Sequence, residues 1–136
     1  MLAARFKDEA LFESLAAINE RFAKLQDTLG AAMRHALVLS GEPSGTFLKT
    51  LAFYEKAEVI DTAASWQRCR TARNLAAHDY ETAYPEIAEH FNTLHDLRAP
   101  LYQASARFLE YCANALGVSP VGRGFTQDFL KIVRGS

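Results

Sequence analysis

An apolar stripe with heptad spacing runs from Leu11 to Leu39, and it constrains the fold of this chain more than any other feature. One row of the stripe consists of Leu11, Ile18, Leu25, Ala32 and Leu39, and a second row consists of Leu15, Phe22, Leu29 and Ala36. Residues with this spacing lie on one side of an α-helix. The stripe therefore predicts one long helix over about 8–40, which other helices must cover.

Turn-forming residues predict where the second and third helices begin and end. The segment SGEPSG, residues 40–45, contains two glycines and a proline and should end the first helix. Ser44 is placed to cap the second helix, which is expected over about 45–57. Asp61 is expected to cap a third helix that runs to about Asp79.

A fourth helix is expected to begin near Pro85 and to reach about Leu116, with a kink or break near Ala99 because Pro100 follows. From about residue 117 the chain is a turn-rich extension, GVSPVGRG, followed by FTQDFLKIV, which could form a short terminal helix. No segment alternates like a strand, and short loops join the long helices. The predicted fold is all-α, an up-and-down bundle of four to five helices forming a single domain over 1–136.

Charge and cysteine content exclude several classes of protein. The chain has 15 Lys and Arg against 16 Asp and Glu, so any anionic partner must be held by a local patch. Cys69 and Cys112 form no CxxC or Cys/His cluster, which favours reduced thiols in the cytoplasm over a disulfide framework. The N-terminus is charged, and no run of about 18 apolar residues follows, so no membrane association is expected.

Histidines and acids in the fourth helix do not have the spacing of a metal site. His90 and His95 are five residues apart, with Asp96 beside the second. That spacing places the imidazoles on different faces of a helix, unlike the i, i+4 pair of zinc proteases. We expect no metal and no cofactor.

The third helix carries an unusual concentration of positive charge. Arg68, Arg70 and Arg73 lie between Trp66 and His78, with no carboxylate among them. This pattern indicates a local anion-binding surface, and Arg68 and Arg70 are its candidate RNA-binding residues. The ordinary alternative is a solvated helix face, with Trp66 in the core or in a dimer contact.

Two further residues near the end of this helix suggest chemistry on a phosphodiester. Asn74 and His78 are four residues apart and share a face, whereas Arg73 and His78 diverge by about 140°. An imidazole can move a proton to or from a ribose oxygen while a guanidinium stabilises charge on phosphorus, and neither step needs a metal. The alternative is that these groups only cap the helix end.

The segment RNLAAHDY resembles the RX4HXY signature of the HEPN superfamily, and specifically its HepT-like branch. Arg73, His78 and Tyr80 match the three fixed positions, and Asn74 supplies the polar residue often seen after the arginine. The four- or five-helix layout, with the motif ending the third helix, fits that family over most of the chain. The segments RFAKLQDTLG and WQRCRTARNLAAHDY also resemble small bacterial proteins encoded beside minimal nucleotidyltransferases.

This resemblance implies a toxin–antitoxin pair. HepT-like proteins are metal-independent endoribonucleases that act as homodimers and are silenced by a separate nucleotidyltransferase antitoxin. On that basis Arg73 and His78 would be catalytic with Asn74 in support, and Tyr80 would accept AMP from the partner. This chain has no GSxxxG followed by DxD, so it is not expected to be the nucleotidyltransferase. A noncatalytic HEPN-fold subunit that binds a nucleotidyltransferase is the competing interpretation, and the near-neutral charge favours it.

Overall fold

A computed structural model describes residues 2–42, 45–78, 84–118 and 131–132 of the chain, without the side-chain surroundings of residues 2–9, 11–12, 75–78 and 84–87. The helices are α1 (Leu2–Leu39), α2 (Phe47–Lys56), α3 (Ala63–His78) and α4 (Tyr84–Tyr111), followed by a π-helical turn, η1 (Cys112–Leu116). These described ranges contain no strand. The prediction of an all-α fold is therefore confirmed.

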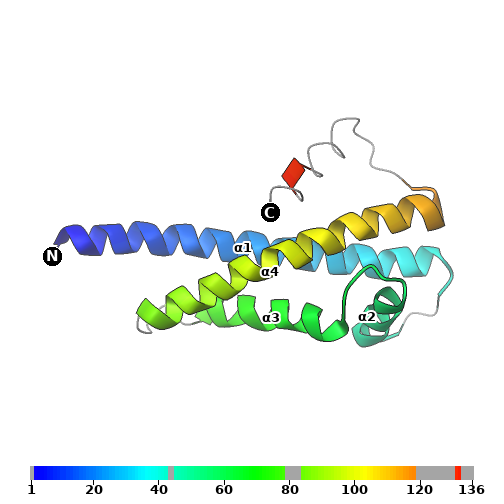
Figure 1. The fold of residues 1–136 in the computed structure, drawn as a ribbon, viewed down its shortest axis with the longest axis horizontal. Coiled ribbons are helices and arrows are strands. Elements are labelled where there is room, and N and C mark those ends of the chain that lie inside the picture. The colour runs from blue at the N-terminus through cyan, green and yellow to red at the C-terminus, as the bar shows by residue number, and fades with distance from the viewer. Residues whose placement is uncertain (1, 43–44, 79–83, 119–130, 133–136) are drawn as a thin grey trace.

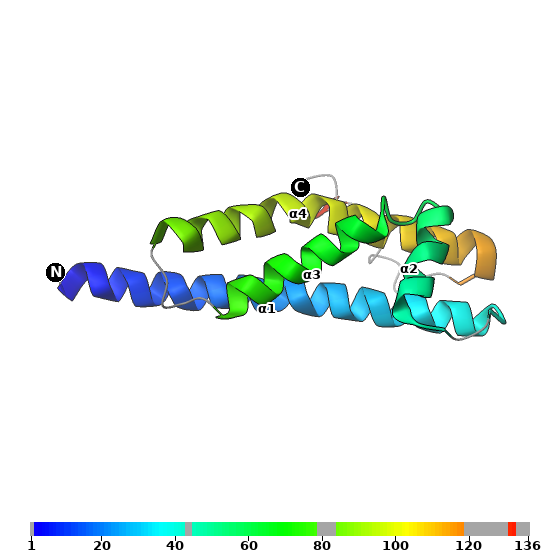
Figure 2. The same ribbon diagram turned by 90° about the horizontal axis from the view of Figure 1, so that it is seen from below.

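The three long helices lie side by side. Helices α1 and α4 run in the same direction, and α3 runs antiparallel to both and packs against both (Figure 1). The short helix α2 lies across the C-terminal half of α1 and also contacts α3 (Figure 2). The bundle thus places the end of α3 beside the first half of α1, away from α2.

The core centres on Tyr54 of α2, whose side chain is fully buried together with those of Met33, Leu51, Leu94 and Val59. The Tyr54 hydroxyl donates a hydrogen bond of 2.6 Å to the carbonyl of Met33. This bond gives the buried hydroxyl a partner and fixes α2 to α1. Burial raises the pKa of Tyr54 well above its ordinary value, so the phenol stays neutral.

The buried surface of α1 is rotated relative to the predicted stripe. The row through Phe22, Leu29 and Ala36 is buried as expected, but Ile18 is 50% exposed and Leu39 is 64% exposed. The other buried row is Asn19, Gln26 and Met33, which lies one residue further along the helix than the predicted row. Gln26 of this row bonds to the backbone of α3, and hydrophobic periodicity could not indicate that this polar residue is buried between the two helices.

The predicted N-cap of the third helix was wrong by one residue. Helix α3 begins at Ala63, and the hydroxyl of Thr62 accepts a 2.9 Å hydrogen bond from the backbone N–H of Ser65. Thr62 is therefore the cap. Asp61 instead accepts a 2.8 Å hydrogen bond from Arg107 of α4. The prediction that Ser44 caps the second helix was also wrong, because α2 begins at Phe47 and Thr46 is in the N-cap position. The predicted helix end at Asp79 lies outside the described residues.

Of the kink or break predicted near Ala99, the break is absent, because α4 continues through Pro100, and the kink stays a prediction. A proline inside a helix removes one backbone hydrogen bond. Here Leu97, Leu101 and Ala104 are buried on both sides of it, and their packing keeps the helix continuous. Lys131 and Ile132 are helical, whereas the rest of the expected terminal helix lies outside the described residues.

Candidate functional site on helix α3

The arginines of α3 differ in their surroundings. Arg68 and Arg70 are exposed, whereas the side chain of Arg73 is only 11% exposed. Arg70, Asn74 and His78 are spaced four residues apart, so these positions follow one face of the helix. Arg70 and Asn74 show that this face is open to solvent. Arg68 stands about 200° around the helix from Arg70 and does not share this face.

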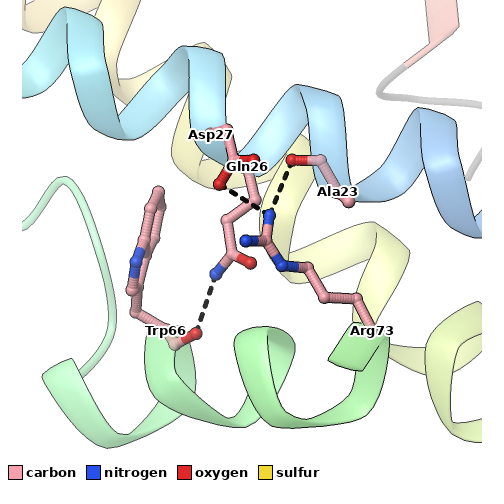
Figure 3. Close-up of polar contacts among 5 residues, drawn as sticks. All are labelled: Ala23, Gln26, Asp27, Trp66 and Arg73. Carbon is pink, nitrogen blue, oxygen red and sulfur yellow. Dashed lines mark hydrogen bonds and ion pairs between the residues drawn. The ribbon is translucent and has the colours of Figure 1, made fainter. Parts of the chain in front are cut away.

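Arg73 crosses from α3 to α1, where its NH1 atom makes two contacts (Figure 3). It lies 2.7 Å from a carboxylate oxygen of Asp27, and it donates a 2.7 Å hydrogen bond to the backbone carbonyl of Ala23. The two acceptors fix the direction of the guanidinium. The arginine run lacks acids along the helix, but at Arg73 the fold supplies a carboxylate from a different helix.

The two partners of Arg73 differ in how firmly they hold it. The Asp27 side chain is 68% exposed, so water screens its attraction to the guanidinium. The Ala23 carbonyl belongs to the backbone of α1 and cannot move away. The Nε atom of Arg73 is buried and has no hydrogen-bond partner among the described residues. The guanidinium thus keeps donor capacity beyond the two bonds it makes.

A second bond between α1 and α3 lies beside Arg73. Gln26 donates a 2.8 Å hydrogen bond to the backbone carbonyl of Trp66, and Figure 3 shows its side chain next to the guanidinium. Trp66 was expected in the core or in a dimer contact, and at 5% exposure it lies in the core. Cys69 is buried as expected, and burial raises the pKa of its thiol to about 11.

A groove of about 370 Å³ runs between α1, α2 and α3 next to this contact. Two arginines line it, Arg70 from α3 and Arg34 from α1. The rings of Phe47 and Trp66 also line it, with their centroids 6.1 Å apart. A Cβ at Gly30 would lie 3.2 Å from Phe47 and 3.3 Å from Trp66, so the glycine lets both rings pack closely against α1. Arg34 and Arg70 give this groove two cationic groups that suit a phosphate, and Asp27 also lies in its lining.

Sequence reasoning did not identify Asp27 or Arg34 as parts of this region. Both are exposed residues of the long first helix, where charged side chains are ordinary. Their separation of seven residues puts them on the same side of α1, and this was the available signal. Only the packing of α3 shows that this side faces the arginines.

The structure gives less detail for His78 and Tyr80, the other two residues of the motif. His78 belongs to α3 and is the last described residue of this segment of the chain. The side-chain surroundings of His78, and all of Tyr80, lie outside the described residues. A meeting of the Arg73 and His78 side chains therefore stays a prediction.

Within the described ranges, no three His, Cys, Asp or Glu side chains gather as metal ligands would. None of the helices in that part of the chain has the length and apolarity needed to cross a bilayer. Comparison of the chain with protein-family models, curated proteins and solved structures finds no match. A functional assignment therefore rests on the motif, the fold and the geometry of α3.

Proposed function

We propose that this protein is a metal-independent endoribonuclease whose site is the motif at the end of α3. The observation that carries the proposal is the exposed face of α3, along which Arg70, Asn74 and the position of His78 follow one another. This face lies beside the groove that Arg34 and the two aromatic rings line. An RNA strand lying along this face would place phosphates against the arginines and reach the end of the helix.

In the proposed reaction, the imidazole of His78 takes the proton of a ribose 2′-hydroxyl. The 2′-oxygen then attacks the adjacent phosphorus, and the bond from phosphorus to the 5′-oxygen breaks. The leaving 5′-oxygen takes a proton from a second imidazole. The products are a 2′,3′-cyclic phosphate and a 5′-hydroxyl, and no metal is required.

Arg73 stabilises the negative charge that develops on phosphorus, and for this it must exchange Asp27 for the phosphate. An ion pair with an exposed carboxylate is worth about 0.2–1 kcal/mol, so the exchange costs little. The Ala23 carbonyl keeps the guanidinium in place during the exchange. In this proposal the carboxylate of Asp27 occupies the place beside the Arg73 guanidinium that the phosphate takes when RNA binds.

A homodimer would complete the site. Position 78 lies about 140° around α3 from position 73, so one copy does not direct both groups toward one phosphate. A two-fold axis near the end of α3 would bring the His78 of a second copy into reach and would supply the second imidazole. Static light scattering at micromolar concentration should therefore report a dimer, and a monomer would contradict the composite site.

The proposal includes silencing by a separate nucleotidyltransferase that transfers AMP to Tyr80. Tyr80 follows His78 by two residues, so an attached AMP would add a bulky anion next to the site. It would compete with RNA for the arginines through its charge and would obstruct the site through its bulk.

One observation favours a second candidate function, a noncatalytic subunit that binds a nucleotidyltransferase. The pairing of Arg73 with Asp27 and Ala23 is what a purely structural arginine makes, and it satisfies the charge without any substrate. In that case the motif would only hold α3 against α1, and the exposed arginines would bind the partner.

Incubation of the purified protein with an RNA oligonucleotide and with DNA of the same sequence, both in EDTA, separates the two functions. The ribonuclease should cleave the RNA, leave the DNA intact because it lacks the 2′-hydroxyl, and leave 2′,3′-cyclic phosphate ends. Intact RNA, together with a stable complex with a nucleotidyltransferase of the proposed partner class, would support the second function instead.

A further inference from the structure

A cavity of about 620 Å³ lies between α1 and α4, and none of the α3 residues whose side chains the structure describes, 63–74, lines it. Its lining comes from residues 15–25 of α1 and 91–102 of α4. Its volume falls within the range of about 300–1,000 Å³ that is typical of sites for small molecules. It is a separate feature from the groove beside α3, which uses Gln26, Asp27, Ala31 and Arg34 on another side of α1.

The two walls of the cavity have opposite character. The α1 wall is mostly apolar and consists of Leu15, Ile18, Phe22 and Leu25, whose spacing of three and four residues keeps them on one face. The facing wall of α4 has a polar row at similar spacing, made of Asn92, His95, Arg98 and Tyr102. Phe91 and Leu94 of α4 also line the cavity, so it combines apolar surface with a few polar groups, as sites for small molecules do.

The polar groups of the cavity favour an anion. Arg98 of α4 and Arg21 of α1 both line it, and no Asp or Glu is among its described lining residues. The side chain of Arg98 is partly buried, and its Nε atom is shielded from solvent without a hydrogen-bond partner in the described part of the chain. A buried donor without a partner is costly, and an oxyanion in the cavity would satisfy it.

We infer that this cavity binds a small amphipathic anion, with its carboxylate or phosphate head on Arg98 and Arg21 and its apolar body against the α1 wall. The planar guanidinium forks suit either head group. Phe22 and Leu94 are buried and form an apolar floor, whereas Ile18 is 50% exposed and lies at the mouth. This inference is independent of the proposed ribonuclease, whose residues lie on α3.

Isothermal titration calorimetry with octanoate, octyl phosphate and 1-octanol on the full chain tests the site, each ligand being kept below its micellar concentration. Octanoate or octyl phosphate should bind saturably with one molecule per chain, and the better of the two identifies the head group. The uncharged octanol should bind at least about tenfold more weakly, because it cannot engage the guanidinium as an anion.

Arg98→Met removes the charge and keeps much of the apolar stem, and it should weaken binding of the anionic ligand by at least about tenfold. Arg107→Met is the matched control, since Arg107 belongs to the same helix but pairs with Asp61 outside the cavity, and it should bind like wild type. Should Arg98→Met fail to fold by circular dichroism, Ile18→Asp at the exposed mouth replaces it. That variant should also bind weakly, because it adds a negative charge to the apolar wall.

Three results would overturn the inference. The first is no saturable binding of either anion at millimolar concentration. The second is equal binding by wild type and Arg98→Met. The third is a wild-type dimer that Ile18→Asp converts to a monomer in light scattering, which would show that a second copy of the chain covers this face.

Discussion

The contact of Arg73 with α1 predicts a specific ranking of stability losses. The bond from the guanidinium to the Ala23 carbonyl measures 2.7 Å at a side chain that is 11% exposed, and a charged hydrogen bond of this kind is worth about 1.5–3 kcal/mol. The ion pair with Asp27, whose side chain is 68% exposed, is worth about 0.2–1 kcal/mol. The carbonyl therefore contributes more than the carboxylate.

Two substitutions separate these contributions. Arg73→Met removes both contacts and should lower the free energy of unfolding by about 2–4 kcal/mol. Asp27→Asn removes only the charge of the partner and should cost less than about 1 kcal/mol. Urea denaturation followed by circular dichroism, at one fixed protomer concentration, measures both. Equal losses in the two variants, or no loss in Arg73→Met, would refute this account of the contact.

The same pair of variants reports on RNA. If the Asp27 carboxylate competes with RNA phosphate for the Arg73 guanidinium, Asp27→Asn should tighten RNA binding by about 1.4- to 5-fold. This factor corresponds to the loss of an ion pair worth about 0.2–1 kcal/mol. Arg73→Lys keeps the positive charge but not the planar fork, so RNA cleavage should fall strongly while binding changes less. Wild-type cleavage by Arg73→Lys would show that only the local charge matters.

Three further predictions concern other residues. In a fluorescence titration, the Arg34→Gln/Arg70→Gln double variant should bind single-stranded RNA more weakly and reduce the slope of the logarithm of the binding constant against the logarithm of the salt concentration by about 1.4. The control Arg107→Gln should leave both quantities unchanged. Burial raises the pKa of Cys69 from 9.0 to about 11, so at pH 8 this thiol should react with Ellman's reagent only after unfolding, measured in Cys112→Ser so that the half-buried Cys112 does not contribute. The contribution of the Cys69 thiol to stability should be complete below pH 9.0 and lost as the pH rises through about 11, and prompt labelling of native Cys112→Ser would contradict this. Incubation with ATP, magnesium and a nucleotidyltransferase of the proposed partner class should add AMP to Tyr80 and none to Tyr80→Phe. Peptide mass spectrometry that finds the same modification in that variant would refute the assignment.

The sequence predicts the helices well because each is encoded locally. Hydrophobic spacing indicates α1, and turn-forming residues separate α2, α3 and α4. The prediction from sequence is wrong where tertiary contacts override the local conformational preference of a residue. Asp61 is a good capping residue, but Arg107 from a distant helix binds it and Thr62 caps α3. Pro100 favours a break, but the buried residues around it keep α4 continuous.

The candidate site is only partly predictable for a similar reason. Spacing alone places Arg70, Asn74 and His78 on one face of α3, and the structure shows that Arg70 and Asn74 are exposed. Spacing cannot show that Arg73 turns toward α1, because its partners Asp27 and Ala23 lie 46 and 50 residues earlier in the chain. The groove with Arg34 depends equally on how α1, α2 and α3 pack.

The central claim is that His78 moves protons in RNA cleavage without a metal, and one rate comparison tests it directly. The initial rate of cleavage of a labelled single-stranded RNA is measured in EDTA for the wild-type protein and for His78→Ala, with circular dichroism to confirm that both are folded. The account predicts cleavage by the wild type that EDTA does not reduce, and a loss of about 100-fold to 10,000-fold in His78→Ala. Equal rates for the two proteins, or a wild-type rate that EDTA abolishes, would contradict it.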